Sequence, residues 1–150
     1  YMSVVYSDQI LLWDIMVARP ARILPVNDMV TALGFSADGT RILTGTHEGS
    51  LQPWDLLSGK IMRAGFSAHR GPITSLGFSW PCGSSSDMAF TCGHDGFVRF
   101  WSQGHMSSSD DVGTEHEASL PLHSLSHSKQ LPSVIDGAFT PSNDLLLACV

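Results

Sequence analysis

A tryptophan phrase that recurs about every 45 residues constrains the fold of this chain more than any other feature. It occurs as LLWDI (11–15), LQPWDL (51–56) and FVRFWS (97–102), so its tryptophans are 41 and 47 residues apart. A second phrase also recurs, as DMVTALGFSADG (28–39), GPITSLGFSW (71–80) and PSVIDGAFTPSND (132–144). Self-similarity at a fixed period of this length is the signature of a repeat architecture.

Within each unit the sequence is typical of short strands. The runs are five to seven residues long with β-branched and aromatic residues, they are bounded by Asp-Gly, Glu-Gly or Ser-Gly, and no convincing helical periodicity appears. Four such strands per unit predict an all-β fold of four-stranded antiparallel propeller blades. We expect strands near 9–14, 21–25, 29–35, 41–46, 50–55, 60–66, 72–78, 88–93, 97–102, 120–125, 134–140 and 144–149.

The chain resembles the WD-repeat β-propeller family. The resemblance rests on Trp13-Asp14, Trp54-Asp55, the phrase 35–39 and the unit from Ala68-His69 to Trp101, and it covers nearly the whole chain. The repeats are divergent from the family pattern. Pro25-Val26 stands where the family has Gly-His, Glu48 replaces an Asp, Trp80-Pro81 replaces a Pro-Asp-Gly turn, and Ser102 replaces the Asp after Trp101.

The repeats divide the chain into about three blades' worth of one propeller. We expect a partial blade 1–25, a blade 26–66, a blade 67–126 with insertions 80–87 and 102–119, and a partial blade 127–150. Propellers close with four to eight blades, so the sequence predicts that these residues are a segment of a longer chain. Both insertions should project from the same face of one blade. They are either tolerated surface loops or a docking element, in which Ser107-Ser108-Ser109 before Asp110-Asp111 are candidate phosphorylation sites.

The resemblance also implies a structural hydrogen-bond chain within the third blade. In the family a His before the first strand, a Ser or Thr on the second, an Asp in the following turn and the Trp on the third strand are joined. In this sequence His69, Thr91, Asp95 and Trp101 take those places. We therefore assign no catalytic residue, because His69 and Asp95 would already be occupied. Val26 has no polar atoms, so the second blade should lack this chain, depend on apolar packing and be the softer blade.

Two histidines of the repeats lie outside the hydrogen-bond chain and are expected at the surface. His47 and His94 occupy equivalent turns in neighbouring blades, and such turns lie too far apart for zinc, whose nitrogen ligands stand at about 2.0–2.1 Å. We predict no metal and no cofactor. The residues at this end of the blades form a candidate partner-binding rim, with Asn27 and Asp28 in the connection before it: His47, Glu48, Arg70, Pro72 and His94.

Charge and composition narrow the possible partners and compartment. The net charge is −6 with eight Lys and Arg and no basic run, which argues against nucleic acid. The longest apolar runs fall well short of the roughly 20 residues that span a bilayer. Three cysteines at irregular spacing favour a reducing compartment, cytoplasmic or nuclear.

These observations predict a non-enzymatic scaffold that binds other proteins or peptides within a multiprotein assembly. Its further partners would be the remaining blades of the parent chain. Two narrower alternatives are a substrate-recruiting subunit of a ubiquitin-ligase type complex and a cytoskeletal or ciliary tandem-propeller scaffold. A propeller-based hydrolase is a less favoured alternative, because the histidines and acids lie in the hydrogen-bond chain or are scattered in loops.

Overall fold

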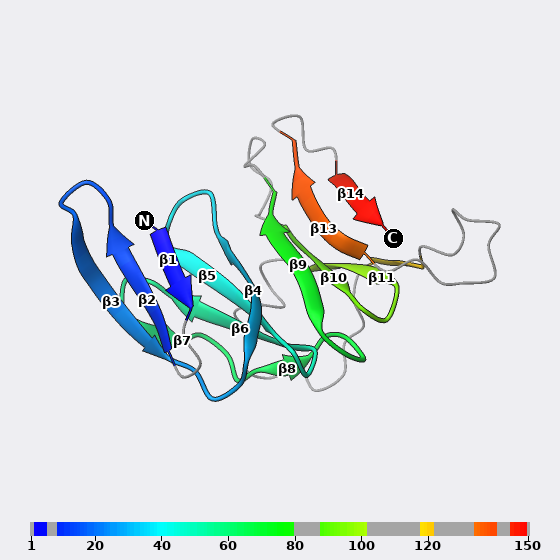
Figure 1. Cartoon of the computed structure of the whole chain (residues 1–150), viewed down its shortest axis with the longest axis horizontal. Coiled ribbons are helices and arrows are strands. Elements are labelled where there is room, and N and C mark those ends of the chain that lie inside the picture. Colours follow the sequence, from blue (N-terminus) through cyan, green and yellow to red (C-terminus); the bar gives the residue numbers. More distant parts are fainter. Residues whose placement is uncertain are drawn as a thin grey trace.

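The computed structural model of the chain describes residues 2–5, 9–79, 88–101, 118–121, 134–140 and 145–149. Within those ranges every regular element is a β-strand, and every strand pair is antiparallel, which confirms the predicted all-β class. The strands form four sheets that follow one another along the chain (Figure 1).

The first two sheets contain the N-terminal half of the chain. The first has the order β1-β2-β3, and the second has the order β4-β5-β6-β7 with β8 also paired to β6. Their strands are β1 (Met2–Val5), β2 (Gln9–Asp14), β3 (Arg19–Pro25), β4 (Val30–Phe35), β5 (Arg41–Thr46), β6 (Ser50–Asp55), β7 (Lys60–Ile61) and β8 (Phe66–Ser67).

The remaining strands form one four-stranded and one two-stranded sheet. The third sheet has the order β12-β11-β10-β9, and the fourth pairs β13 with β14. Their strands are β9 (Ile73–Phe78), β10 (Ala89–Gly93), β11 (Phe97–Trp101), β12 (Ala118–Pro121), β13 (Val134–Phe139) and β14 (Leu145–Cys149). β12 starts two residues earlier than the strand expected at 120–125, inside the range expected as an insertion, and residues 122–125 lie outside the described part.

The single strand expected at 60–66 is wrong, because two short strands take its place. β7 and β8 both pair with β6, and residues 62–65 between them are not in a strand. The gap between β7 and β8 is explained by β6, the strand with which both pair, because Pro53 of β6 has no N–H to donate to a neighbouring strand. The Gln52 side-chain amide donates to the Arg63 carbonyl instead, and Met62 N donates to the Pro53 carbonyl at 3.0 Å.

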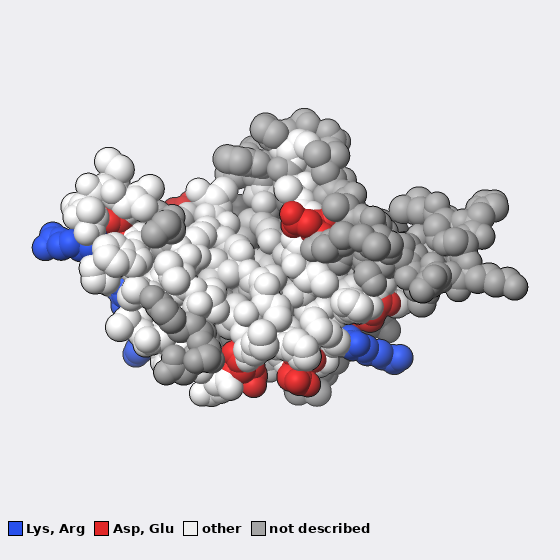
Figure 2. All heavy atoms as spheres, viewed as in Figure 1, with Lys and Arg blue, Asp and Glu red and all other residues white. Residues whose placement is uncertain are grey.

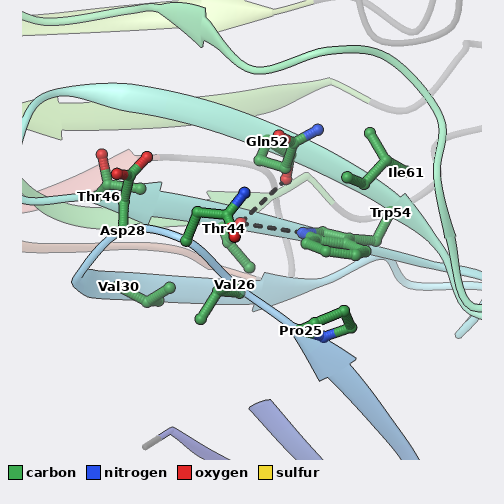
Figure 3. A pocket seen from close by; sticks show the side chains of 10 residues that line it. Pro25, Val26, Asp28, Val30, Thr44, Thr46, Gln52, Trp54 and Ile61 are labelled. Atoms are coloured by element: carbon green, nitrogen blue, oxygen red, sulfur yellow. Dashed lines mark hydrogen bonds between the residues drawn. The ribbon is translucent and has the colours of Figure 1, made fainter. Parts of the chain in front are cut away.

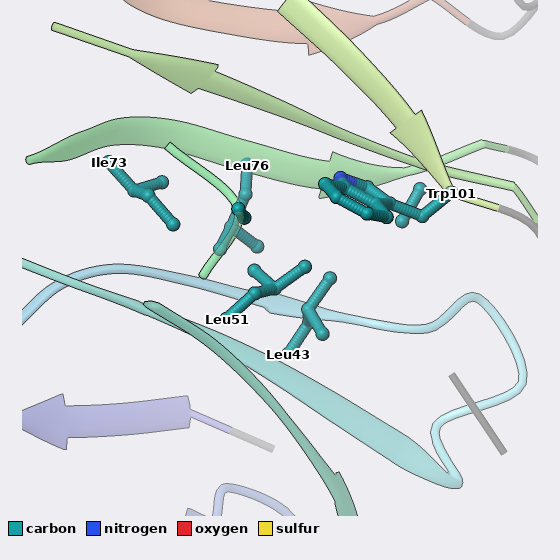
Figure 4. Packing of buried hydrophobic residues seen from close by; sticks show 7 residues of the cluster. Leu43, Leu51, Ile73, Leu76 and Trp101 are labelled. Carbon is teal, nitrogen blue, oxygen red and sulfur yellow. The ribbon is translucent and has the colours of Figure 1, made fainter. Parts of the chain in front are cut away.

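The sheets pack face to face in chain order, and a core lies between the second and third sheets. Leu43 and Leu51 of the second sheet meet Ile73, Leu76 and Trp101 of the third, as Figure 4 shows. The Trp101 ring is 4% exposed and packs edge-to-face on Phe66, with ring centroids 5.2 Å apart. The recurring tryptophan therefore belongs to the contact between successive sheets as well as to its own sheet.

A second core joins the first sheet to the second. Ile10, Leu12 and Leu24 of the first sheet pack with Ile42 and Trp54 of the second, and all five are at most 3% exposed. Each sheet between two neighbours thus has apolar residues on both faces. This explains the almost continuous burial of β5 from Ile42 to Thr46.

The first strands of successive sheets run beside one another, β4 next to β9 and β9 next to β13 (Figure 1). Hydroxyl groups link them. Thr31 Oγ1 donates to the Ile73 carbonyl at 2.6 Å, and Ser75 Oγ donates to Asp136 Oδ1 at 2.9 Å while accepting from Gly137 N at 3.1 Å. These bonds satisfy polar groups at the inner edge and fix neighbouring sheets in register.

The expected insertion 80–87 and most of the expected insertion 102–119 lie outside the described residues. The same holds for the serines at 107–109 and for the histidines of that region.

Candidate functional site

The third sheet brings four sequence-selected residues into one hydrogen-bonded chain. Trp101 Nε1 donates to Thr91 Oγ1 at 3.0 Å, Thr91 Oγ1 lies 2.8 Å from His69 Nε2, and His69 Nδ1 lies 2.8 Å from Asp95 Oδ1. The His69 side chain is fully buried, and that of Asp95 is 8% exposed. This hydrogen-bond chain connects the segment before β9 to β10, to the β10–β11 turn and to β11.

The acceptor at one end of this chain decides where the imidazole proton is assigned. The Asp95 carboxylate can only accept, so we assign the proton of His69 to Nδ1, 2.8 Å from Asp95 Oδ1. Thr91 Oγ1 then accepts from the indole of Trp101 and donates its own hydrogen to His69 Nε2. Every member is satisfied in this arrangement, which is the condition under which a buried polar network stabilises a fold.

Asp95 is held by more than the histidine. Its carboxylate also accepts from Arg70 N at 3.1 Å and Phe97 N at 3.2 Å, so it closes the turn between β10 and β11. Burial by itself raises the pKa of Asp95, but the hydrogen bonds from His69 and Arg70 and the positive charge of Arg99 outweigh it. The pKa of Asp95 therefore lies below its ordinary value, and the residue is a carboxylate at neutral pH.

Arg99 also belongs to this network, although no sequence motif indicated it. Its Nη1 donates to Asp95 Oδ2 at 3.0 Å and lies 2.6 Å from His69 Nδ1, and the guanidinium stacks over Phe97 with its carbon 4.8 Å from the ring centroid. A signal was present, because Arg99 lies two residues before Trp101 and side chains two apart on a strand share a face. Arg99 is also the direct cross-strand partner of Thr91.

The histidine requires a glycine beneath it. A Cβ atom on Gly93 would lie 2.1 Å from His69 Nδ1 and 2.5 Å from its Cγ, so the imidazole fills the space that any side chain at 93 would need. In the second sheet the position equivalent to Gly93 is Thr46, and Val26 stands in the place of His69. The two sheets thus use two matched pairs, His with Gly and Val with Thr.

The second sheet keeps part of the hydrogen-bond chain. Trp54 Nε1 donates to Thr44 Oγ1 at 3.1 Å, and the Thr44 hydroxyl donates to the Gln52 carbonyl at 3.2 Å. Val26 packs against the core that includes Trp54. The second blade therefore lacks the histidine part of the chain, as expected, but it is held by the indole–hydroxyl bond as well as by apolar packing.

The histidines of the candidate rim occupy equivalent tight turns. His94 N donates to the Pro72 carbonyl and His47 N to the Met29 carbonyl, each at 2.9 Å. Both side chains are exposed, and that of His47 lies 3.6 Å from Glu48 Oε1. The backbone of each turn is therefore fixed to the neighbouring connection while the imidazole is presented to solvent.

The other rim residues surround these turns. Arg70 is exposed and its amide is held by Asp95, and Pro72 is half-buried. Asn27 and Asp28 are exposed in the equivalent connection before β4. The turn 46–49 touches the next connection directly, because the Gly49 carbonyl accepts from Ala68 N at 2.9 Å and His69 N at 3.0 Å. The structure thus places the candidate residues at one end of two adjacent, cross-linked sheets.

Basic residues are sparse on the visible face of the molecule. On the face that Figure 2 shows, Lys and Arg atoms appear only towards the left and right edges, so no basic surface forms there. Among the described residues no group of three or more His, Cys, Asp or Glu side chains is placed to hold a metal ion. In the same residues no helix has the length and apolarity that a membrane span requires.

The fold and the indole–hydroxyl bond that recurs within the second and third sheets define a repeat protein built of antiparallel blades. The model of the WD domain, G-beta repeat, matches residues 19–55 and 60–102, and the chain belongs to this family.

The chain is similar to parts of two longer proteins. Residues of the chain are 34% identical over 70 positions to the periodic tryptophan protein 2 homolog of Dictyostelium discoideum, covering 47% of the chain and 7% of that protein. They are 33% identical over 100 positions to actin-interacting protein 1 of Drosophila melanogaster, covering 64% of the chain and 16% of that protein. The chain therefore spans only a small part of the length of either relative.

Proposed function

We propose that this chain is part of a non-enzymatic WD-repeat scaffold that binds another protein through the candidate rim. The observation that carries the proposal is the pair of equivalent turns that present His47 and His94. Each turn is anchored by a backbone bond to the neighbouring connection, so exposed side chains project from a rigid frame. Rigid frames with exposed loops are the usual arrangement of protein-binding surfaces.

The assignment of His69 and Asp95 to structure supports a scaffold over a hydrolase. His69 has both ring nitrogens in contact with fixed partners, and Asp95 accepts from a ring, two backbone amides and a guanidinium. A general base needs a free nitrogen or oxygen within reach of a substrate. Neither residue offers one, so we propose that their role is to hold the turn that carries His94.

The rim proposal is tested with the full-length protein in cell lysate. Partners captured by the wild type are compared with those captured by the double variant Arg70→Ala, His94→Ala. A matched control, Arg19→Ala with Lys60→Ala, removes two exposed residues beside the β2–β3 and β6–β7 hairpins. We expect the rim variant to lose partners that the control retains. Equal partner sets for rim variant and wild type would overturn the proposal.

Similarity to a named relative favours one of the two narrower roles, the cytoskeletal scaffold. The similarity to actin-interacting protein 1 favours a cytoskeletal partner over a ubiquitin-ligase role, and it fits a location in the cytoplasm. Cosedimentation of the full-length protein with actin filaments tests this directly. A cytoskeletal role through actin predicts that the protein pellets with filaments and that the rim variant stays in the supernatant. Wild-type protein that remains in the supernatant would exclude actin as the partner.

A further inference from the structure

A cavity beside Trp54 lies where the second blade has Val26 in the place of the His69 of the third. It has a volume of about 70 Å³, and its walls include Val26, Asp28, Thr44, Thr46, Trp54 and Ile61 (Figure 3). Thr44 and Trp54 are 2% and 3% exposed, whereas Asp28 and Ile61 are exposed. The cavity therefore reaches from the surface of the rim to the buried indole.

The neighbouring blade shows which kind of group such a place holds. There the imidazole of His69 lies 2.8 Å from Thr91 Oγ1, the hydroxyl that accepts from Trp101. Thr44 is the equivalent of Thr91, and Val26 supplies no ring to contact it. Thr46 takes part of the vacated volume, and the cavity is what remains.

The hydrogen bonds of Thr44 define what an incoming group must do. Its hydroxyl hydrogen is committed to the Gln52 carbonyl, and one lone pair accepts from Trp54. A hydroxyl oxygen has a second lone pair, so Thr44 offers only an acceptor to the cavity. A ligand that reaches it must donate an N–H or an O–H.

The mouth of the cavity also favours a ligand that donates a hydrogen bond. Figure 3 shows the Asp28 carboxylate at the same end as Thr46, with Trp54 at the other end and Thr44 between. Asp28 has no hydrogen bond or ion pair within the described part of the chain, and it is the only charged residue lining the cavity. A ligand with one N–H at depth and a second, cationic N–H at the mouth would satisfy both oxygens.

We propose that this cavity binds the imidazolium side chain of a histidine presented by a partner protein. A protonated imidazole carries two N–H groups on opposite sides of one small ring, one for Thr44 and one for Asp28. The volume exceeds the roughly 30 Å³ share of one water and is well below the roughly 150 Å³ of a cavity that encloses benzene, so one five-membered ring fits end-on through the open mouth. An arginine would carry its charge past Asp28 towards the indole.

The inference rests on the proposed protein-binding function, and a small probe tests it separately. The full-length protein is labelled with 5-fluorotryptophan, and the Trp54 signal is assigned with Trp54→Phe. The probe is N-acetylhistidine N-methylamide at pH 5.5, where an unperturbed histidine with a pKa of about 6.5 is mostly protonated. We expect a saturable shift of the Trp54 signal, whereas the Trp101 signal stays fixed because His69 already fills its site.

Two controls make the result specific. The thiazolylalanine analogue has a ring of the same size without an N–H and should leave Trp54 unshifted. Asp28→Asn should weaken binding of the histidine probe about tenfold, since a charge-assisted hydrogen bond becomes a neutral one, while Asp14→Asn in the first sheet should not. Absence of a saturable shift, or equal binding of the two probes, would overturn the inference.

The outcomes separate the two proposals. Loss of partners by the rim variant together with no probe binding removes the histidine site and keeps the scaffold function. Probe binding with unchanged partner sets keeps the site and removes the rim as the surface that binds partners. A stronger shift with N-acetylarginine N-methylamide than with the histidine probe would replace the imidazolium by a guanidinium and overturn the assignment.

Discussion

The imidazole of His69 lies over Gly93 so closely that a methyl group there would stand 2.1 Å from Nδ1. The two residues are 24 positions apart in the sequence and belong to one unit of structure. The histidine can reach Thr91 and Asp95 only because position 93 has no side chain. The hydrogen-bond chain of the blade therefore depends on the glycine as well as on the side chains that form it.

Gly93→Ala should displace His69 and break this chain. We expect the free energy of unfolding to fall by about 2–3 kcal/mol, because buried donors and acceptors are left without partners. Chemical denaturation of the full-length protein measures the change. The same substitution in a His69→Ala background should cost much less, since the methyl group then has room. Equal costs in the two backgrounds would show that the contact between the two residues is unimportant.

Trp101→Phe should destabilise the protein more than Trp54→Phe. Loss of the Trp101 N–H disturbs a network that runs on through Thr91 to His69, whereas Thr44 keeps its bond to the Gln52 carbonyl when Trp54 is replaced. We expect losses of about 2 and about 1 kcal/mol, respectively, by denaturant titration. Equal losses would mean that the second blade is not the softer one.

Acid should destabilise the blade through Asp95. Its pKa in the folded state is lower than the unfolded value of about 3.9, so the carboxylate contributes stability that is fully present above that value. This contribution is lost as pH falls through the lower, folded-state pKa. Asp95→Asn should therefore be less stable than wild type at pH 7 and lose less stability between pH 5 and pH 3.

Asp38 provides the comparison for that experiment. Hydrogen bonds from Ser36 and Thr40 lower the pKa of Asp38 to about 2, although its side chain is 46% exposed. Solvent screening reduces what such an exposed group contributes. The pH profile of Asp38→Asn should accordingly follow wild type more closely than that of Asp95→Asn. The reverse order would argue against the buried network as the source of acid sensitivity.

The second blade should tolerate the histidine of the third blade only when the residues around it are replaced as well. Val26→His alone places an imidazole against Thr46 and should lower the unfolding midpoint. Adding Thr46→Gly and Glu48→Asp supplies the space and the carboxylate of the third blade, and the triple variant should regain the lost stability. A triple variant no more stable than Val26→His would show that the two blades differ in backbone geometry as well as in these side chains.

Much of this structure follows from the sequence by itself. The spacing of Trp13, Trp54 and Trp101 determined the repeat, the alternation of apolar residues determined most strands, and the turn glycines placed their ends. The resemblance to the WD-repeat family also selected His69, Thr91, Asp95 and Trp101, because each takes the place of a residue in the family's hydrogen-bond chain. These patterns are present in the sequence and do not depend on tertiary contacts.

Only the tertiary structure decided the remaining features. Arg99 joined the network because β10 and β11 pair in a register that sets it opposite Thr91, and Pro53 divided the next strand because the ladder there needed an N–H. The cavity beside Trp54 depends on the volumes of Val26 and Thr46 together, and those residues are 20 positions apart. Such effects arise from packing between distant segments, and single-sequence patterns contain no measure of that space.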